Sequence, residues 1–323
     1  MPLTSTAEAI LAGNRRALAK AITLVESSRA KDREASQQLL NELLPHTGKS
    51  LRLGITGVPG VGKSTFIETF GQHVIAEGHK VAVLAVDPSS PKAGGSILGD
   101  KTRMELLSRE SRAFIRPSPA GRALGGVALK TRESMLLCEA AGFDVVIVET
   151  VGVGQSEHQV GSMVDFFLIL LLPGGGDELQ GIKKGILELA DAIMINKADG
   201  ESASLARKTK LHYQTAMSLL STGDFWTPEV HTCSALKQEG LTECWAMMRR
   251  YQEEAAGHGA FDQKRAEQNV QWMWQLTDEM LRQQLHDNAA ISAQLSEVLV
   301  QVSAGELTPV TAANRIIAQL RQS

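Results

Sequence analysis

The sequence lacks the features that would place the protein outside the ordinary globular class. Aromatic residues make up only 4% of its 323 residues, and the formal net charge is only -3. Such a small charge imbalance argues against nucleic acid or a membrane surface as the main partner. Few aromatics combined with 29 glycines suit an α/β nucleotide-binding fold better than a β-sandwich.

Cysteine is also scarce, and its spacing indicates neither bridges nor zinc. The three cysteines, Cys138, Cys233 and Cys244, form no C-x-x-C pair. A disulfide framework and a structural zinc site are therefore not expected. We expect reduced, partly buried thiols in a cytoplasmic protein.

Long apolar runs and a leader are missing as well. The first 22 residues contain no basic stretch that leads into an apolar one, so no secretory signal is expected. The longest apolar stretch, FFLILLL at residues 166–172, is far too short to span a bilayer.

What the sequence does contain is a series of short runs that are apolar throughout. They are LRLGIT at 51–56, KVAVLAV at 80–86, DVVIVE at 144–149, DFFLILLL at 165–172 and DAIMIN at 191–196. Continuous rather than alternating apolar character is typical of strands buried on both faces. Strands that alternate with helical stretches predict an α/β fold with a doubly wound, mostly parallel sheet.

Helical patterns flank this region on both sides. Residues 1–47 and the chain after about residue 236 show apolar residues at helical spacing, and Thr308 with Pro309 suits the start of a last helix. We therefore expect an N-terminal helical segment at 1–47, a nucleotide-binding domain at 48–257 and a C-terminal helical arm at 258–323. The arm has more apolar surface than a lone helical hairpin can hide, which predicts a homodimer.

A glycine-rich stretch, GVPGVGKST, follows the first apolar run. Gly57, Gly62, Lys63 and Ser64 match the pattern G-x-x-x-x-G-K-[ST], whose backbone N–H groups surround nucleotide phosphates at a helix N-terminus. We expect Lys63 to bridge the β- and γ-phosphates and Ser64 to bind Mg²⁺. The predicted nucleotide-binding residues of this loop are Gly57, Pro59, Gly60, Val61, Gly62, Lys63, Ser64 and Thr65.

The tetrapeptide NKAD, at residues 196–199, indicates guanine. The Asp199 carboxylate can accept hydrogen bonds from N1–H and the amine at C2 of guanine. Adenine has neither donor and would leave the carboxylate buried and unpaired. Lys197 can lay its methylene stem over the base, and Asn196 completes the motif. The later stretch CSAL can supply a backbone N–H to the guanine oxygen from Ser234, Ala235 or Leu236.

Acidic residues follow two of the predicted strands. Glu149 ends one of them, and Gly152 lies three residues on, which matches a D-x-x-G element with Glu in place of Asp. Asp87 follows another strand, and Asp100 follows a glycine-rich stretch. We expect the three carboxylates to converge near the γ-phosphate, where they bind Mg²⁺ and position water. The alternatives are a turn residue for Asp87 and a helix N-cap for Asp100.

Together these stretches resemble the MeaB/ArgK family of SIMIBI-class P-loop GTPases. The resemblance runs through most of the chain. It covers GVPGVGKST, VDPSSP, GGSILGDKTRM, ETVGVGQSE, LLPGGGDELQGIKKGILELAD and NKAD.

The resemblance implies a hydrolase that converts GTP to GDP and phosphate. It also implies a chaperone of adenosylcobalamin-dependent methylmalonyl-CoA mutase that gates cofactor loading and protects the mutase. It implies a homodimer formed through the C-terminal helices. Within LPGGGDELQGIKKG it implies a mobile segment in which Gln180 and Lys183 couple the nucleotide state to the mutase. No glutamine stands at an obvious water-orienting position, although Gln155 and Gln180 are candidates, so slow intrinsic turnover is expected.

Two other functions stay open at this point. One is a nucleotide-dependent kinase or ATPase of arginine and ornithine transport, as older descriptions of the family have it. No separate domain for a phosphoryl acceptor is evident in the sequence. The other is a nickel-delivering GTPase, but the eight histidines are scattered and no H-x-H occurs.

Overall fold

The computed structural model describes residues 3–27, 29–86, 104–118, 124–150, 155–174, 184–220, 225–287 and 289–320. The chain divides into two compact units, Met1–Arg265 and Ala266–Ser323. The division falls inside helix α13 (Ala260–Asp287), so the first residues of this helix belong to the larger unit.

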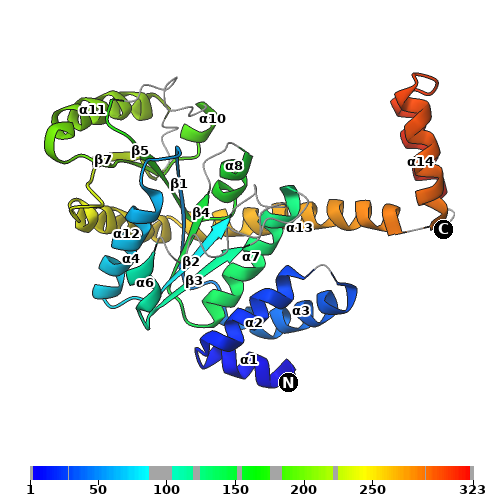
Figure 1. Cartoon of the computed structure of the whole chain (residues 1–323), viewed down its shortest axis with the longest axis horizontal. Coiled ribbons are helices and arrows are strands. Elements are labelled where there is room, and N and C mark those ends of the chain that lie inside the picture. Colours follow the sequence, from blue (N-terminus) through cyan, green and yellow to red (C-terminus); the bar gives the residue numbers. More distant parts are fainter. Residues whose placement is uncertain are drawn as a thin grey trace. The chain divides into compact units, whose positions relative to one another are not determined.

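The larger unit is built on a sheet whose described strands all run parallel to their neighbours. The order across the sheet is β3-β2-β4-β1-β5-β6-β7 (Figure 1). This order confirms the predicted doubly wound parallel sheet. The strands are β1 (Leu51–Gly57), β2 (Val81–Val86), β3 (Ala113–Ser118), β4 (Val145–Thr150), β5 (Phe166–Leu171), β6 (Ala192–Ile195) and β7 (Glu229–Thr232).

Helices cover both faces of the sheet, which explains why the strands are apolar on both sides. Neighbouring strand residues such as Val146 and Ile147 enter different cores because successive side chains point to opposite faces. One core includes α4 (Lys63–Ala76), α6 (Glu105–Arg109) and α12 (Leu241–Gly257). The other includes α7 (Leu124–Ala140), α8 (Gln155–Gly161), α10 (Lys184–Leu187) and α11 (Ala203–Leu220).

The first part of the chain is helical, as predicted. It forms α1 (Leu3–Leu11), α2 (Arg15–Glu26), α3 (Ala30–Leu43) and the short 3₁₀ helix η1 (Leu44–His46). Asn14 caps α2 by accepting hydrogen bonds from the N–H groups of Arg16 and Ala17. These helices pack on α7 and share its hydrophobic core.

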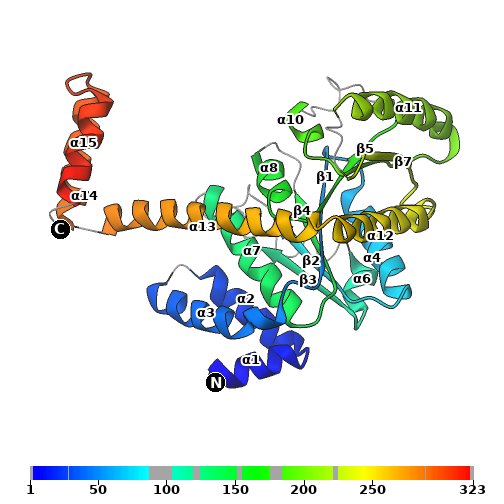
Figure 2. The same ribbon diagram turned by 180° about the vertical axis from the view of Figure 1, so that it is seen from behind.

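Two strands were missed by the sequence prediction, and both lie at the edges of the sheet. β3 contains Arg116 and Pro117, and β7 is only four residues long with the sequence EVHT. Figure 2 shows β7 next to α11. An edge strand is half exposed, so it need not be apolar throughout, and this is the pattern on which the prediction relied.

A network of buried charges fixes the beginning of α13 to the first unit. Arg265 donates through Nε and Nη2 to both carboxylate oxygens of Asp165, at 2.8 and 2.6 Å. It also donates to the carbonyl oxygens of Gly48 and Ser50, just before β1. Lys264 donates to the carbonyl oxygen of Asp165 at 2.6 Å. The first unit is therefore complete only when α13 has begun.

A second buried ion pair lies beside this network. Arg52 in β1 donates through Nε and Nη2 to Glu139 of α7, at 2.8 and 3.0 Å. Ser50 Oγ and the Gly48 N–H also donate to Glu139. Burial favours the neutral acid, but these donors outweigh it and hold the pKa of Glu139 below its ordinary value.

The second unit contains the rest of α13, with α14 (Ala289–Ser303) and α15 (Pro309–Leu320). Thr308 accepts a hydrogen bond from the Thr311 N–H, and Pro309 opens α15, as the sequence predicted. Val298 and Ala312 are buried. Large apolar side chains nevertheless remain exposed on this unit: Val270, Met273, Trp274, Met280, Leu281, Leu299, Val300, Val310 and Ile317.

All three cysteines are free, and they are fully rather than partly buried. Burial raises the pKa of the Cys233 thiol to about 12. It also raises the pKa values of Cys138 and Cys244. These thiols are consequently protonated and inert packing groups at neutral pH.

Candidate functional site

The glycine-rich loop connects β1 to α4 at the carboxyl end of the central strand. Gly57 ends β1, and a Cβ atom there would lie 2.5 Å from the carbonyl oxygen of Leu170 in the neighbouring strand. Gly62 has a left-handed φ of 94°, and a Cβ atom there would lie 2.9 Å from the Asn196 side chain. Only glycine fits this close approach of the loop to its neighbours.

The turn leaves a row of backbone donors without acceptors in the described part of the chain. They are the N–H groups of Gly60, Gly62, Lys63, Ser64 and Thr65. The next N–H group, that of Phe66, donates to the Gly62 carbonyl oxygen and so begins the ordinary helical pattern. Such a group of N–H donors at the positive end of a helix suits the oxygens of an anionic phosphate chain.

Lys63 adds a positive charge to this turn. Its Nζ donates to the carbonyl oxygens of Gly57 and Val58, at 2.5 and 3.4 Å. Partial burial lowers the pKa of Lys63, while the carboxylates of Glu149 and Glu157 oppose this shift. The ammonium therefore lies among the P-loop carbonyls and near two carboxylates, where phosphate oxygens can replace the carbonyl contacts.

Oxygen donors suited to Mg²⁺ lie on two elements beside the loop. Ser64 is half buried in the first turn of α4. Glu149 is paired in register with Ile55 of β1 and Ala85 of β2, near the carboxyl end of β4. Hydroxyl and carboxylate oxygens are the hard ligands that Mg²⁺ prefers, so these residues fit the ion. Within the described ranges, no group of three or more His, Cys, Asp or Glu side chains forms a metal cluster.

Several predicted site residues lie outside the described residues. They are Asp87, Asp100, Gly152, Gln180 and Lys183. The side chain of Gln155, at the start of α8, belongs to the same group. The two strands that precede Asp87 and Gly152 end side by side, because Val86 of β2 pairs in register with Thr150 of β4.

The Asn196 side chain joins three parts of the site. Its Nδ2 donates to the Val61 carbonyl oxygen at 2.9 Å, and its Oδ1 accepts from the Ala235 N–H at 3.0 Å. The Cys233 thiol also lies within hydrogen-bond distance of Oδ1, at 3.5 Å. Asn196 is 2% exposed, so both ends of its amide serve the protein itself. It ties the end of β6 to the phosphate loop and to the loop after β7.

The remaining residues of the tetrapeptide are more accessible. Lys197 has a left-handed φ of 58°, and its Nζ donates to the Gly60 carbonyl oxygen at 2.8 Å. Its aliphatic stem therefore extends beside the phosphate loop. Asp199 precedes the short helix η2 (Gly200–Ser202), and its carboxylate makes no capping hydrogen bond to that helix. The carboxylate is half exposed and can accept hydrogen bonds from a ligand.

The loop after β7 offers one backbone donor. The Ser234 N–H donates to Glu239, and the Ala235 N–H donates to Asn196. The Lys237 N–H donates to Ser234 Oγ. Among described acceptors, none takes the N–H of Leu236, whose side chain is exposed. Of the three residues predicted here, Leu236 therefore has the N–H that is available to a base.

Glu157 is a site residue that the sequence reasoning did not select. It lies in the first turn of α8, is 3% exposed and interacts electrostatically with Lys63. The sequence contains little indication of this residue, because Glu157 belongs to no motif with a fixed spacing from the phosphate loop.

Comparisons with known proteins identify relatives of this chain. The sequence profile of the family described as "Methylmalonyl Co-A mutase-associated GTPase MeaB" matches residues 18–290. "GTPase ArgK" of Escherichia coli is 49% identical over 300 residues, which are 93% of this chain and 91% of that protein. "Methylmalonic aciduria type A homolog, mitochondrial" of mouse is 46% identical over 319 residues, which are 95% of this chain and 77% of that protein.

A solved structure shows the same fold. The protein described as "LAO/AO transport system kinase" has a TM-score of 0.78 and 40% identity, and the match covers 99% of this chain and 98% of that one. No described helix of the present structure is both long enough and apolar enough to cross a membrane.

Proposed function

The chain belongs to the MeaB family of methylmalonyl Co-A mutase-associated P-loop GTPases, and from this premise we propose that it binds and hydrolyses GTP as a chaperone of methylmalonyl-CoA mutase. In this role it gates adenosylcobalamin loading and protects the mutase. The observation that carries the proposal is the double hydrogen bond of Asn196 to Val61 and Ala235. These hydrogen bonds fix the position of residues 196–199, which are proposed to bind guanine, relative to the phosphate loop.

The phosphate chain is held by the loop itself. The unpaired N–H groups of Gly60, Gly62, Lys63, Ser64 and Thr65 bind phosphate oxygens. Lys63 exchanges its contacts with Gly57 and Val58 for the β- and γ-phosphates. Bound Mg²⁺ supplies charge that neutralises the developing negative charge on these phosphates. Ser64 and Glu149 would hold it, together with Asp87 and Asp100.

The guanine base is bound by the NKAD motif and by the loop after β7. The Asp199 carboxylate accepts from N1–H and the amine of guanine, while the Leu236 N–H donates to the guanine oxygen. The stem of Lys197 covers one side of the base. Adenine leaves the Asp199 carboxylate unpaired, which disfavours ATP.

We also propose that the γ-phosphate orders residues 150–157, through the Gly152 N–H, and residues 173–184. The second segment begins next to α11, where the Gly174 N–H donates to Thr209 Oγ1 at 2.9 Å. GDP lacks the γ-phosphate, so the two nucleotides favour different states of these segments. Gln180 and Lys183 then carry the nucleotide state to the mutase.

Two further properties belong to the proposal. The exposed apolar side chains of the second unit, such as Trp274 and Met280, support a homodimer. The free, buried thiols support a reducing location such as the cytoplasm.

Nucleotide titration and phosphate release test the proposal. The wild-type protein should bind GTP and GDP far more tightly than ATP, and purified mutase should accelerate phosphate release from GTP. Equal affinity for ATP and GTP contradicts the reading of the base. Lys183→Ala should leave GDP affinity nearly unchanged but remove most of the acceleration, while Lys184→Ala serves as the matched control. If the mutase accelerates phosphate release by the Lys183 variant as strongly as by the wild type, Lys183 does not couple the nucleotide state to the mutase.

The alternative is a kinase or ATPase linked to arginine and ornithine transport, which the name of the solved relative suggests. Product analysis separates the two functions. A GTPase releases free phosphate in an amount equal to the GTP consumed, whereas a kinase leaves labelled phosphate on an acceptor.

A further inference from the structure

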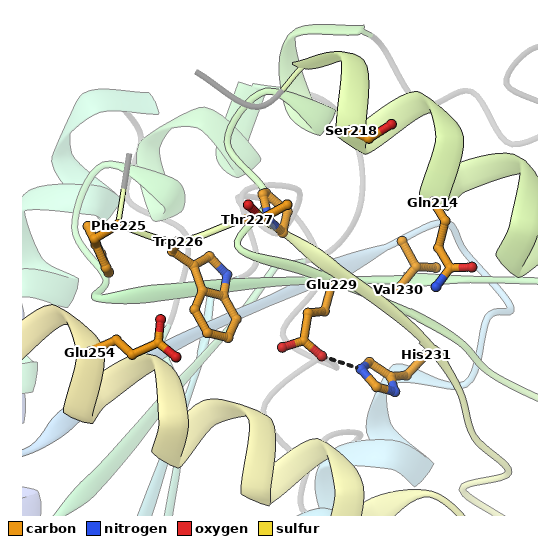
Figure 3. A pocket seen from close by; sticks show the side chains of 10 residues that line it. Gln214, Ser218, Phe225, Trp226, Thr227, Glu229, Val230, His231 and Glu254 are labelled. Atoms are coloured by element: carbon orange, nitrogen blue, oxygen red, sulfur yellow. Dashed lines mark hydrogen bonds and ion pairs between the residues drawn. The ribbon is translucent and has the colours of Figure 1, made fainter. Parts of the chain in front are cut away.

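A cavity of about 540 Å³, open to solvent, lies beside edge strand β7 (Figure 3). Its walls come from α11, the segment 225–228, β7 and α12. This volume is within the range of ordinary small-molecule sites. Trp226 and Glu229 lie at the amino ends of β6 and β7, whereas the nucleotide loops follow the carboxyl ends of the strands. The cavity is therefore separate from the nucleotide site.

The aromatic part of the wall is held rigidly. Trp226 Nε1 donates to the carbonyl oxygen of Asp191 at 2.8 Å. The indole also packs edge-on against Phe166 and Tyr251, with ring centroids 6.5 and 5.3 Å away. Phe225 lines the cavity next to Trp226. A preformed aromatic surface of this kind can bind a flat or aliphatic group, or a cation over the ring face.

The charged part of the wall is acidic. Glu229 accepts from His231 Nε2 at 2.7 Å and from Arg250 at 2.6 Å. Burial raises the pKa of Glu229, but these donors outweigh it and keep the group ionised. Glu254 on α12 is exposed, and in Figure 3 the Trp226 indole lies between its carboxylate and that of Glu229.

The remaining polar groups of the wall carry no formal charge. Gln214 on α11 reaches the cavity from the far side of β7. None of the described lining residues is a lysine or an arginine, and the donors beside the wall, His231 and Arg250, already pair with Glu229. An uncharged ligand would form no ion pair with Glu254.

We propose that this cavity binds a small organic cation, such as an amidinium, guanidinium or ammonium compound with a flat body. The positive group lies between Trp226 and Glu254, where cation–π attraction and a charge-assisted hydrogen bond act together. Glu229 contributes a second negative potential, although Arg250 and His231 already share its oxygens. The proposal does not depend on the proposed GTPase function.

A series of ligands with one shape and three charges tests the charge requirement. Benzamidine, benzamide and benzoate are titrated separately into full-length protein saturated with GDP, and binding is measured by calorimetry and saturation-transfer NMR. Benzamidine should bind in a saturable way, about tenfold or more tighter than benzamide, and benzoate should not bind. Equal binding of benzamidine and benzamide would overturn the proposal, and so would benzamidine binding that appears only when GDP is left out.

Two neighbouring variants locate the site. Glu254→Gln should weaken benzamidine binding about tenfold, because the charge-assisted hydrogen bond becomes a neutral one. Glu253→Gln, which changes an exposed residue outside the cavity wall, should leave it unchanged. Glu254 is on the helix surface, so its variant is expected to fold, which thermal unfolding checks. Unchanged binding in Glu254→Gln, or equal loss in both variants, would place the cation elsewhere and overturn the proposal.

Discussion

Asn196 donates through Nδ2 to the carbonyl oxygen of Val61, and this 2.9 Å hydrogen bond joins residues 135 positions apart in the chain. The contact is buried and connects the NKAD motif directly to the glycine-rich loop. The motif therefore has a structural role of its own, since it sets the spacing between the two loops of the proposed nucleotide site.

Replacing Asn196 by alanine is expected to reduce both stability and GTP affinity. The change leaves the Val61 carbonyl and the Ala235 N–H without their partner, which costs about 2–4 kcal/mol of unfolding free energy. Urea unfolding and GDP titration measure the two effects. Lys197→Met is the control, because it removes one exposed hydrogen bond to Gly60 and should cost less than about 1 kcal/mol. Equal stability losses in the two variants would show that the amide is not the connecting element.

Asp199→Asn is expected to exchange guanine for xanthine nucleotides. The amide offers a donor where the carboxylate offered an acceptor, so GTP affinity should fall about 100-fold while xanthosine triphosphate gains affinity. Titration with both nucleotides checks this exchange of specificity. A parallel loss for both nucleotides would mean that the residue supports the loop without reading the base.

Lys63→Ala is expected to abolish tight triphosphate binding. The Lys63 ammonium bonds to the carbonyl oxygens of Gly57 and Val58, at the start of the loop that carries the free N–H groups, so its loss should reduce GTP affinity about 100-fold. Lys49→Ala, at an exposed position before β1, is the control for a general loss of charge. Unchanged affinity in the Lys63 variant would place the phosphates elsewhere.

The Arg52–Glu139 pair predicts a specific dependence of stability on pH. Glu139→Gln should lower the unfolding free energy by about 3–5 kcal/mol at pH 7, because it leaves Arg52 buried and unpaired. The folded-state pKa of Glu139 is below its ordinary value of 4.5. Its contribution is therefore fully present above pH 4.5 and is lost as the pH falls through the folded-state pKa.

Denaturant unfolding of wild type and Glu139→Gln between pH 7 and pH 3 measures this effect. The difference between the two proteins should shrink as the pH falls. Glu105→Gln is the control, since Glu105 pairs with Arg109 on the exposed surface and should contribute less than about 0.5 kcal/mol. If the difference in unfolding free energy does not change with pH, protonation of Glu139 does not contribute to the loss of stability at low pH.

Met280→Glu in the full-length chain is expected to convert a dimer into a monomer. Met280 is 68% exposed on α13, and Met273, seven residues earlier and so on the same face of the helix, is also exposed. A charge in an apolar interface carries a large desolvation penalty. Sedimentation velocity measures the change. Gln275→Glu, which adds the same charge on the opposite face of the helix, should remain dimeric. A truncation at residue 261 is a poorer test because it also removes Arg265 from the first unit.

The sequence predicted the fold well, and it located the glycine-rich turn between β1 and α4, because both depend on local patterns. Five strands buried on both faces appear as continuous apolar runs, and GVPGVGKST has a fixed spacing. Edge strands β3 and β7 have no such pattern, since polar residues such as Arg116 and His231 are tolerated at the sheet edge. Local patterns thus find the interior of the sheet and miss its borders.

Contacts between distant residues were beyond the reach of the same reasoning. In the sequence, Arg265 cannot be distinguished from a surface arginine. Its buried partner, Asp165, lies 100 residues away in the chain and reaches it only in the folded protein. The bridging role of Asn196 is similar, because the motif predicted a ligand contact while its amide serves Val61 and Ala235. Glu157 and the cavity at Trp226 also depend on packing rather than on spacing.

The attachment of Arg265 has a consequence for the growing chain. Synthesis proceeds from the N-terminus, so all seven described strands are made before this guanidinium exists. Until residue 265 has been added, the Asp165 carboxylate and the carbonyl oxygens of Gly48 and Ser50 lack a buried cationic partner. A nascent sheet with every strand in place is thus still an immature domain. Its final consolidation is delayed until Arg265, in the second turn of α13, has been made and has left the ribosome.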